Sequence, residues 1–129
     1  MLAVDTDLVL RYLLADHPSQ SAKARALIEN NEVFVCTTVL LETEWVLRSL
    51  YHFKPVQIIE ALTAFAGLPR VRLQDAALTA KALEWLTKGA DFADALRFLA
   101  SECCDAFVTF DAQFARTAER LGEIPVRIP

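Results

Sequence analysis

The stretch that decides the fold runs from Met1 to Leu14 and reads MLAVDTDLVLRYLL. The apolar run Leu2–Val4 predicts a short strand, and the apolar periodicity from about Thr6 to Ala15 predicts a helix. Asp5 lies at the junction between them, where a side chain can cap the helix or face a ligand at the carboxyl end of the strand. A strand that leads directly into a helix indicates an α/β fold.

The same alternation of short apolar runs and longer amphipathic segments continues along the chain, which is the pattern of a parallel sheet. Proline marks two helix starts and glycine marks three helix ends. Further strands are predicted at residues 33–36, 71–73, 106–109 and 126–128, and further helices at 18–30, 38–51, 55–67, 75–89, 91–102 and 111–122. We therefore expect one α/β domain over residues 1–129, with a central parallel sheet and helices on both faces.

The composition limits the possible classes of protein. Apolar residues make up 54% of the 129 residues, which is enough for a full core and also allows an oligomer interface. No run approaches the ~18 apolar residues of a membrane span, and the first residues have no basic signal-peptide region. Cys36, Cys103 and Cys104 show no metal-binding spacing, so we expect reduced core cysteines in a cytoplasmic protein.

The net charge of −4 excludes nucleic-acid binding by overall charge alone. A nucleic-acid role would need local basic residues, a bridging cation, or both. Five arginines are candidates for contacting phosphates, with Arg97 the best placed because it follows Asp94 by one helical turn. An intrahelical ion pair or a solvated face is the alternative for each of them. The five are Arg11, Arg48, Arg97, Arg116 and Arg120.

Five acidic residues stand near the predicted carboxyl ends of strands, where ligands bind in open parallel sheets. They are Asp5, Glu42, Asp91, Asp94 and Asp111. We expect Glu42 to be partly buried, because its neighbours in the helix are mostly apolar. Carboxylates this close raise one another's pKa unless a cation joins them, and oxygen ligands favour Mg²⁺ or Mn²⁺. No serine or cysteine has a neighbouring base, which leaves hydrolysis by a metal-activated water.

Each of these acids also has a purely structural interpretation. Asp5, Asp91 and Asp111 suit helix N-caps, and Asp94 can form an ion pair with Arg97. Glu42 can pair with an arginine of its own helix or reach solvent. The spacing alone leaves a metal site and a set of helix caps both open.

Four stretches resemble the motifs of VapC-type PIN-domain ribonucleases, in the right order and over nearly the whole chain. The first is MLAVDTDLVLRYLL, and the later ones are VLLETEWVL at 39–47, DFADAL at 91–96 and FVTFDAQF at 107–114. The resemblance implies a PIN fold and RNA cleavage that depends on Mg²⁺ or Mn²⁺. It also implies a toxin role in a type II toxin–antitoxin system, a homodimer, and a cognate antitoxin with a DNA-binding end.

The site residues implied by the resemblance follow from the matched motifs. Asp5, Glu42 and Asp94 correspond to the core metal-binding acids, and Asp111 to a more peripheral one. Secondary pocket candidates are Thr6, Asp7, Asp91 and Thr109, and RNA-binding candidates are Arg11, Arg97 and Arg116. Asp7 departs from the family, which usually has asparagine there, and the extra acid would make the pocket more negative.

Two surfaces for partners are expected. A clustered acidic pocket attracts a guanidinium, so an antitoxin would insert an arginine there. Its apolar helix would lie near Leu10, Leu13 and Leu14. The apolar stretch from Trp45 to Phe53 is either core, a dimer seam or part of such a groove.

Two other classes compete with a ribonuclease. A non-catalytic PIN-type RNA-binding module would keep the same acids. A phosphoacceptor receiver domain would need paired acids after its first strand and a lysine after its last one. Here Thr6 separates Asp5 from Asp7, and only Pro129 follows the last predicted strand.

Overall fold

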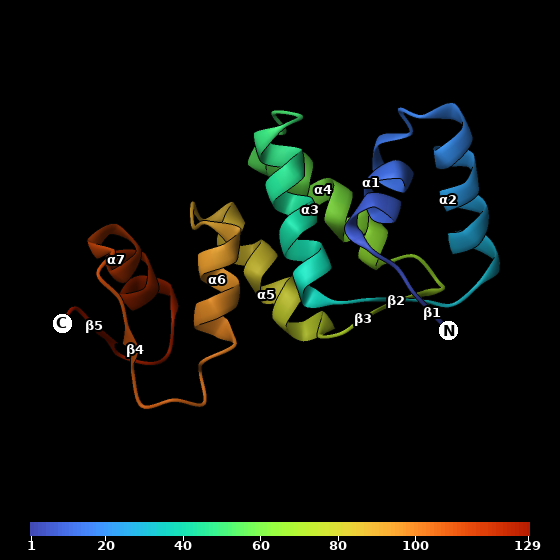
Figure 1. Ribbon diagram of the computed structural model, residues 1–129. Helices are drawn as coiled ribbons and strands as arrows, with labels where there is room; N and C mark the ends of the chain where they lie inside the picture. The colour runs from blue at the N-terminus through green and yellow to red at the C-terminus, as the bar shows by residue number, and fades with distance from the viewer. The chain divides into compact units, whose positions relative to one another are not determined.

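The computed structural model describes residues 1–129 and contains seven helices and five short strands (Figure 1). Every helix and strand expected from the sequence is present, and the pairing of the strands is parallel, so the α/β prediction is confirmed. In chain order the elements are β1 Leu2–Ala3, α1 Thr6–Leu14, α2 Pro18–Asn30, β2 Val33–Val35, α3 Thr37–Ser49, α4 Pro55–Ala66, β3 Val71–Leu73, α5 Ala76–Thr87, α6 Phe92–Leu99, β4 Phe107–Val108, α7 Ala112–Leu121 and β5 Val126–Arg127.

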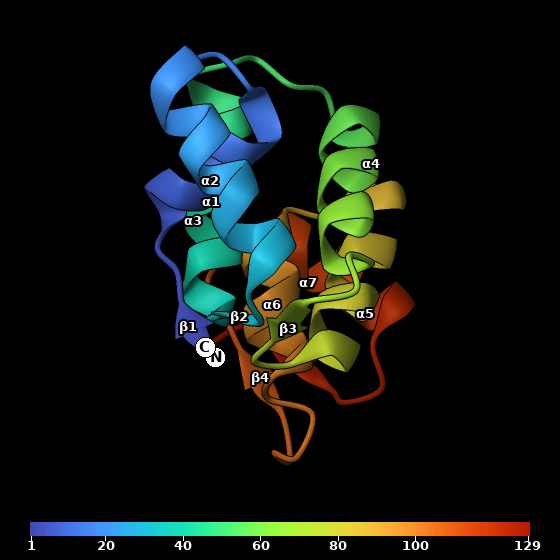
Figure 2. The same ribbon diagram turned by 90° about the vertical axis from the view of Figure 1, so that its right-hand side faces the viewer.

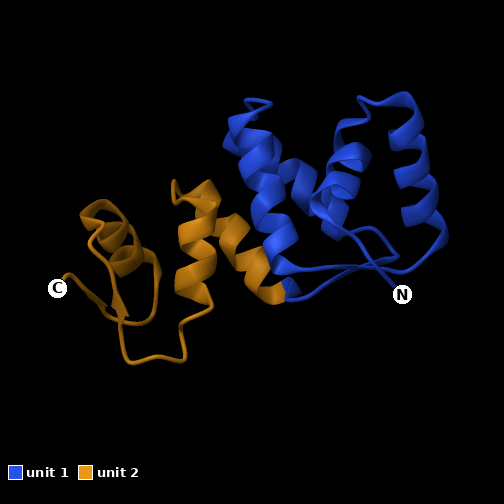
Figure 3. Cartoon of the chain, in the orientation of Figure 1, with its two compact units in different colours: residues 1–76 blue, residues 77–129 orange.

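The chain forms two compact units, residues 1–76 and residues 77–129 (Figure 3). Unit 1 contains a parallel sheet of order β1-β2-β3, and unit 2 contains the parallel pair β4-β5. One central sheet of five strands was expected, whereas the hydrogen bonds between the strands form these two sheets. Strands of two or three residues offer few ladder hydrogen bonds, so short apolar runs alone did not define which strands pair.

Unit 1 has a core of aliphatic side chains from its sheet and four helices. Val33 and Val35 of β2 are fully buried, as expected for a central parallel strand covered on both sides. Helices α1 and α2 lie side by side (Figures 1 and 2), and α3 packs against both α1 and α4. The rings of Tyr12 and Phe65 lie 5.8 Å apart, which joins α1 to α4.

Unit 2 is organised around the fully buried ring of Phe98 in α6. Its centroid lies 5.2 Å from that of Trp85, 5.3 Å from that of Phe107 and 6.2 Å from that of Phe114. Tilted and edge-on aromatic pairs at such distances add to the stabilisation from buried area. Phe98 therefore links α5, β4 and α7 within this unit.

The cysteine prediction was wrong in one respect. Cys103 and Cys104 are exposed and Cys36 is only half-buried, so none is a core residue. The reason is local, since the first two lie in the turn that follows α6 rather than inside a helix. No helix combines the length and the apolar character needed to cross a membrane.

Gly122, which ends α7, gives a stability prediction for unit 2. A methyl group at this position would overlap the ring of Phe98 and lie 2.8 Å from the carbonyl oxygen of Ala118. Neither atom can retreat easily, because Phe98 is fully buried and the oxygen belongs to a helix. Gly122→Ala should therefore lower the free energy of unfolding by about 2 kcal/mol in urea denaturation. Gly67→Ala is the control, since its added methyl would approach no atom closer than 3.4 Å. Equal effects of the two substitutions would contradict the prediction.

Candidate active site

The clearest acidic site lies within unit 2, in a cavity of about 220 Å³. Helices α6 and α7 both begin beside it, so each brings an aspartate to its wall. The residues that line the cavity are Gly89, Ala90, Asp91, Asp94, Asp111, Gln113, Phe114 and Thr117. Three of the five acids selected from the sequence therefore meet here, as their positions at helix starts led us to expect.

Two of these acids cap the helices that they precede. Asp91 accepts a hydrogen bond from the backbone amide of Asp94 at 3.1 Å, and Asp111 accepts one from that of Phe114 at 2.9 Å. The hydroxyl of Thr109 in turn accepts a hydrogen bond from the backbone amide of Asp111 at 3.0 Å. Since a carboxylate has two oxygens and several lone pairs, one cap hydrogen bond leaves capacity for a ligand. The capping and metal-binding interpretations are therefore compatible.

Asp94 is the acid most affected by this environment. Its pKa is raised above the usual value, first because it is partly buried and then because Asp91 and Asp111 place negative charge nearby. Arg97 opposes the shift through an ion pair of 2.9 Å between its Nη1 and Oδ1 of Asp94. Three carboxylates line this cavity, and negative charge gathered in one place favours a bound cation.

Asp5 and Thr6 lie in unit 1, where the chain passes from β1 into α1. Asp5 is exposed and accepts a hydrogen bond from the backbone amide of Leu8 at 3.1 Å, which caps α1. The side chain of Thr6 is buried. Because β1 and β2 pair in parallel, α1 and α3 both start from the same edge of the sheet, and Glu42 lies in the second turn of α3.

The expected partial burial of Glu42 was wrong. Glu42 is exposed, and the buried acid of α3 is Glu44, whose exposed fraction is only 1%. The buried face of α3 carries Leu40, Thr43, Glu44 and Leu47, whose spacing of three and four residues excludes Glu42. Glu44, rather than Glu42, forms an ion pair with Arg48, with 2.9 Å between Oε2 and Nε. Counting apolar neighbours in sequence therefore misplaced the carboxylate, whereas helical periodicity identifies its face correctly.

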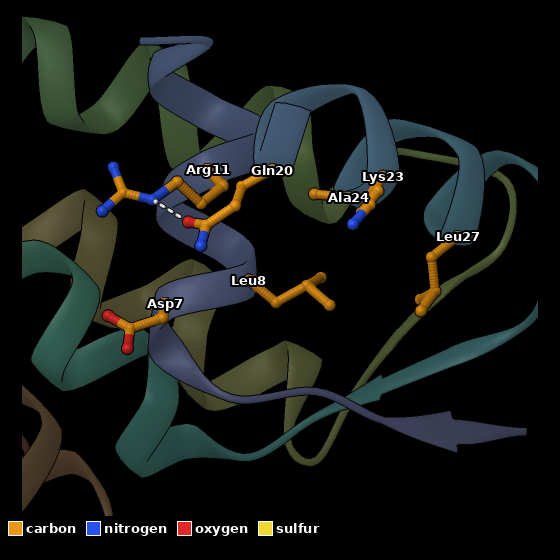
Figure 4. Close-up of a pocket in the computed structure, with 7 residues that line it drawn as sticks. All are labelled: Asp7, Leu8, Arg11, Gln20, Lys23, Ala24 and Leu27. Atoms are coloured by element: carbon orange, nitrogen blue, oxygen red, sulfur yellow. Dashed lines mark hydrogen bonds between the residues drawn. The ribbon is translucent and has the colours of Figure 1, made fainter. Parts of the chain in front are cut away.

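A second cavity, of about 270 Å³, lies between α1 and α2 in unit 1 (Figure 4). Asp7 and Arg11 lie toward one end of it and Lys23 and Leu27 toward the other, with Leu8 and Ala24 between them. Leu10, expected to face a partner, is instead a buried core residue, whereas Leu13 and Leu14 are half-buried. Any apolar contact surface here is thus centred on Leu8 and Leu27.

The arginine candidates divide into two groups. Arg11 pairs with Asp16 at 3.0 Å and donates to Gln20, Arg48 pairs with Glu44, and Arg97 pairs with Asp94. Arg116 and Arg120 are exposed on α7. Arg97 combines a pocket ion pair with a side chain that is 63% exposed, so it is the best placed to contact a phosphate as well.

Phe110 is a surface feature that the sequence analysis missed. Its side chain is 83% exposed, and it directly precedes Asp111, which lines the acidic cavity. Its place after the strand β4 and next to a candidate acid was a usable signal.

No group of three or more histidine, cysteine, aspartate or glutamate side chains lies close enough within either unit to hold one metal ion. The cavity in unit 2 is lined by carboxylate, amide and hydroxyl side chains, whose oxygens fit a hard divalent cation better than zinc or copper.

An acidic cavity between two helix starts in a parallel α/β protein is the kind of site found in metal-assisted phosphodiesterases. The family model for the PIN domain matches residues 2–120, and the chain belongs to the PIN-domain family. This membership indicates a nuclease-type function, and PIN domains usually use divalent metals. No curated protein matches the sequence significantly. The VapC subfamily and the single-domain boundary stay predictions.

The repulsion within the cavity gives a measurable expectation for Asp94. Asp91→Asn retains a good N-cap residue but removes one negative charge that raises the pKa of Asp94. The pKa of Asp94 should therefore fall in this variant, as followed by NMR titration of its carboxyl carbon. Asp105→Asn, in the exposed loop after α6, is a charge-matched control that should leave Asp94 unchanged. An unchanged or higher pKa in Asp91→Asn would exclude this electrostatic coupling.

Proposed function

We propose that the protein is an Mg²⁺- or Mn²⁺-dependent endoribonuclease that hydrolyses RNA phosphodiester bonds and acts as the toxin of a type II toxin–antitoxin system. The observation that carries this proposal is the cavity where Asp91, Asp94 and Asp111 meet, in a chain whose PIN match covers residues 2–120. Asp5, Glu42, Asp94 and Asp111 are proposed as the metal-binding acids, and Thr6, Asp7, Asp91 and Thr109 as secondary pocket residues.

The charge of the cavity supports a metal-dependent reaction. A bound divalent cation would supply a water of lowered pKa and offset the charge on the scissile phosphate. The acids would hold the cation, and Asp94 must be ionised to do so. Because burial and the nearby charges of Asp91 and Asp111 raise the pKa of Asp94, protons would compete with the cation, and activity should rise with pH as Asp94 loses its proton.

Arg97 has two roles in this proposal. Its ion pair holds the carboxylate of Asp94, and most of its side chain remains accessible. A guanidinium in this position can donate to a phosphate oxygen of the substrate as well. Arg11 and Arg116 are proposed as further, weaker phosphate contacts outside the acidic cavity.

The toxin role includes a neutralising antitoxin with a DNA-binding end, a homodimer and a cytoplasmic location. The excess negative charge around Asp94 suits an inserted arginine of the partner. The apolar walls of the cavity between α1 and α2 suit an apolar helix, with Leu8 and Leu27 as contacts. Exposed Trp45, Leu50 and Val56 provide apolar surface for a dimer.

The Asp94→Asn variant tests the catalytic proposal directly. It removes the ionisable acid with little change in shape, so RNA cleavage should fall by at least about 100-fold. EDTA should stop the wild-type reaction, and Mg²⁺ or Mn²⁺ should restore it. Asp105→Asn should cleave RNA at the wild-type rate, and circular dichroism should show the same fold in both variants. Full activity of Asp94→Asn would refute the site, and RNA binding without cleavage by the wild type would favour a non-catalytic PIN module.

The exposed ring of Phe110 supports single-stranded RNA as the form of the proposed substrate. An aromatic ring that is 83% exposed beside the cavity can stack on an unpaired base, whereas bases in a duplex are already stacked.

Phe110→Ala should therefore weaken the binding of a single-stranded RNA by about 10-fold, the loss of one stacked base. Fluorescence anisotropy in EDTA measures this affinity without cleavage. Val108→Ala removes an exposed apolar side chain from β4 and should have no such effect. Equal affinities of wild type and Phe110→Ala would rule out stacking while leaving the metal site untouched.

A further inference from the structure

Two neighbouring thiols, which the proposed nuclease does not use, lie in the loop between α6 and β4. Cys103 and Cys104 are both exposed and free, with 4.0 Å between their sulfur atoms. The loop turns tightly here, since the backbone amide of Cys104 donates to the carbonyl oxygen of Ser101 at 2.9 Å. Both side chains therefore emerge from one turn with their sulfurs close to each other and accessible to solvent.

The sulfur separation distinguishes between two kinds of thiol chemistry. A disulfide requires about 2.05 Å between the sulfurs, and its Cα atoms are usually 4.4–6.8 Å apart. Adjacent residues have Cα atoms only about 3.8 Å apart, so this pair would form a strained bridge. Two thiolates on one tetrahedral ion at about 2.3 Å lie about 3.8 Å apart. The observed 4.0 Å between the sulfurs is close to the separation of two thiolates on one metal ion and far from the length of a disulfide bond.

We propose that Cys103 and Cys104 together bind one thiophilic cation of the Zn²⁺ or Cd²⁺ class. Two thiols lose their protons to solvent and two sulfur–metal bonds form, with no change of oxidation state. Two protein ligands leave the remaining positions to water, so binding should be weaker and more reversible than in a four-ligand structural site.

The binding of a cation to this pair depends on pH because each sulfur binds as a thiolate. The cation displaces one proton from each thiol, so affinity should increase with pH.

This site differs in chemistry from the acidic cavity. Thiolates select soft or borderline ions, whereas the oxygen donors around Asp94 select Mg²⁺ or Mn²⁺. The loop nevertheless joins α6, which carries Asp94, to β4, which leads to Asp111. A cation on this loop would restrain the connection between two acid-bearing segments without occupying the cavity itself.

The experiment titrates the reduced, full-length protein with Cd²⁺ and follows the ultraviolet thiolate-to-metal charge-transfer band. One Cd²⁺ per chain is expected, with affinity that rises with pH and is unaffected by excess Mg²⁺. Cys103→Ser and Cys104→Ser should each lower the affinity by at least about 10-fold. Cys36→Ser is the matched control and should bind as the wild type does, because this thiol lies in unit 1.

Three results would overturn the proposal. They are wild-type affinity in either single variant of the pair, loss of binding in Cys36→Ser, and one ion per two chains in native mass spectrometry. The last result would mean that the ion bridges two molecules instead of binding to one turn. None of them bears on RNA cleavage, so the proposed nuclease function stands or falls separately.

Discussion

Hydrogen bonds between aspartate side chains and backbone amides fix the starts of α1, α6 and α7. Asp5, Asp91 and Asp111 each accept one such bond across three residues, which satisfies a helix amide that has no partner within its helix. The same bonds hold each carboxylate close to the end of the preceding segment. The same hydrogen bond therefore fixes both the position of the carboxylate and the start of the helix, and a substitution that removes it alters both.

This constraint has an electrostatic consequence within unit 2. Two capped helix starts face one cavity, and the acid that lies partly buried between them is Asp94. Helix N-termini favour negative charge, so the caps are individually favourable, whereas burial and the charges of the two caps together raise the pKa of Asp94. Arg97 offsets only part of that shift. The result is a cavity lined by three carboxylates, which suits a bound cation.

The sequence predicted the elements well because caps, prolines and glycines are local signals. Asp91 and Asp111 identified the starts of two helices, and apolar runs identified the strands. Side-chain environments were harder to predict from the sequence, because they depend on which face of each helix is buried. Glu42 and Glu44 differ by two positions and lie on different faces of α3, so only the register of the helix separates them. The division of the strands into two sheets depends on pairing between distant residues, for which the short strands carried no local signal.

The ion pair between Glu44 and Arg48 has a consequence for the order of folding events. Both partners belong to α3, four residues apart, so they meet as soon as the helix forms. Helices form in about a microsecond or less, before most side chains are packed. The carboxylate of Glu44 thus enters the interior with its counter-ion already beside it. A partner from a distant segment would arrive later and leave a lone charge to be desolvated on the way, which is the more costly route.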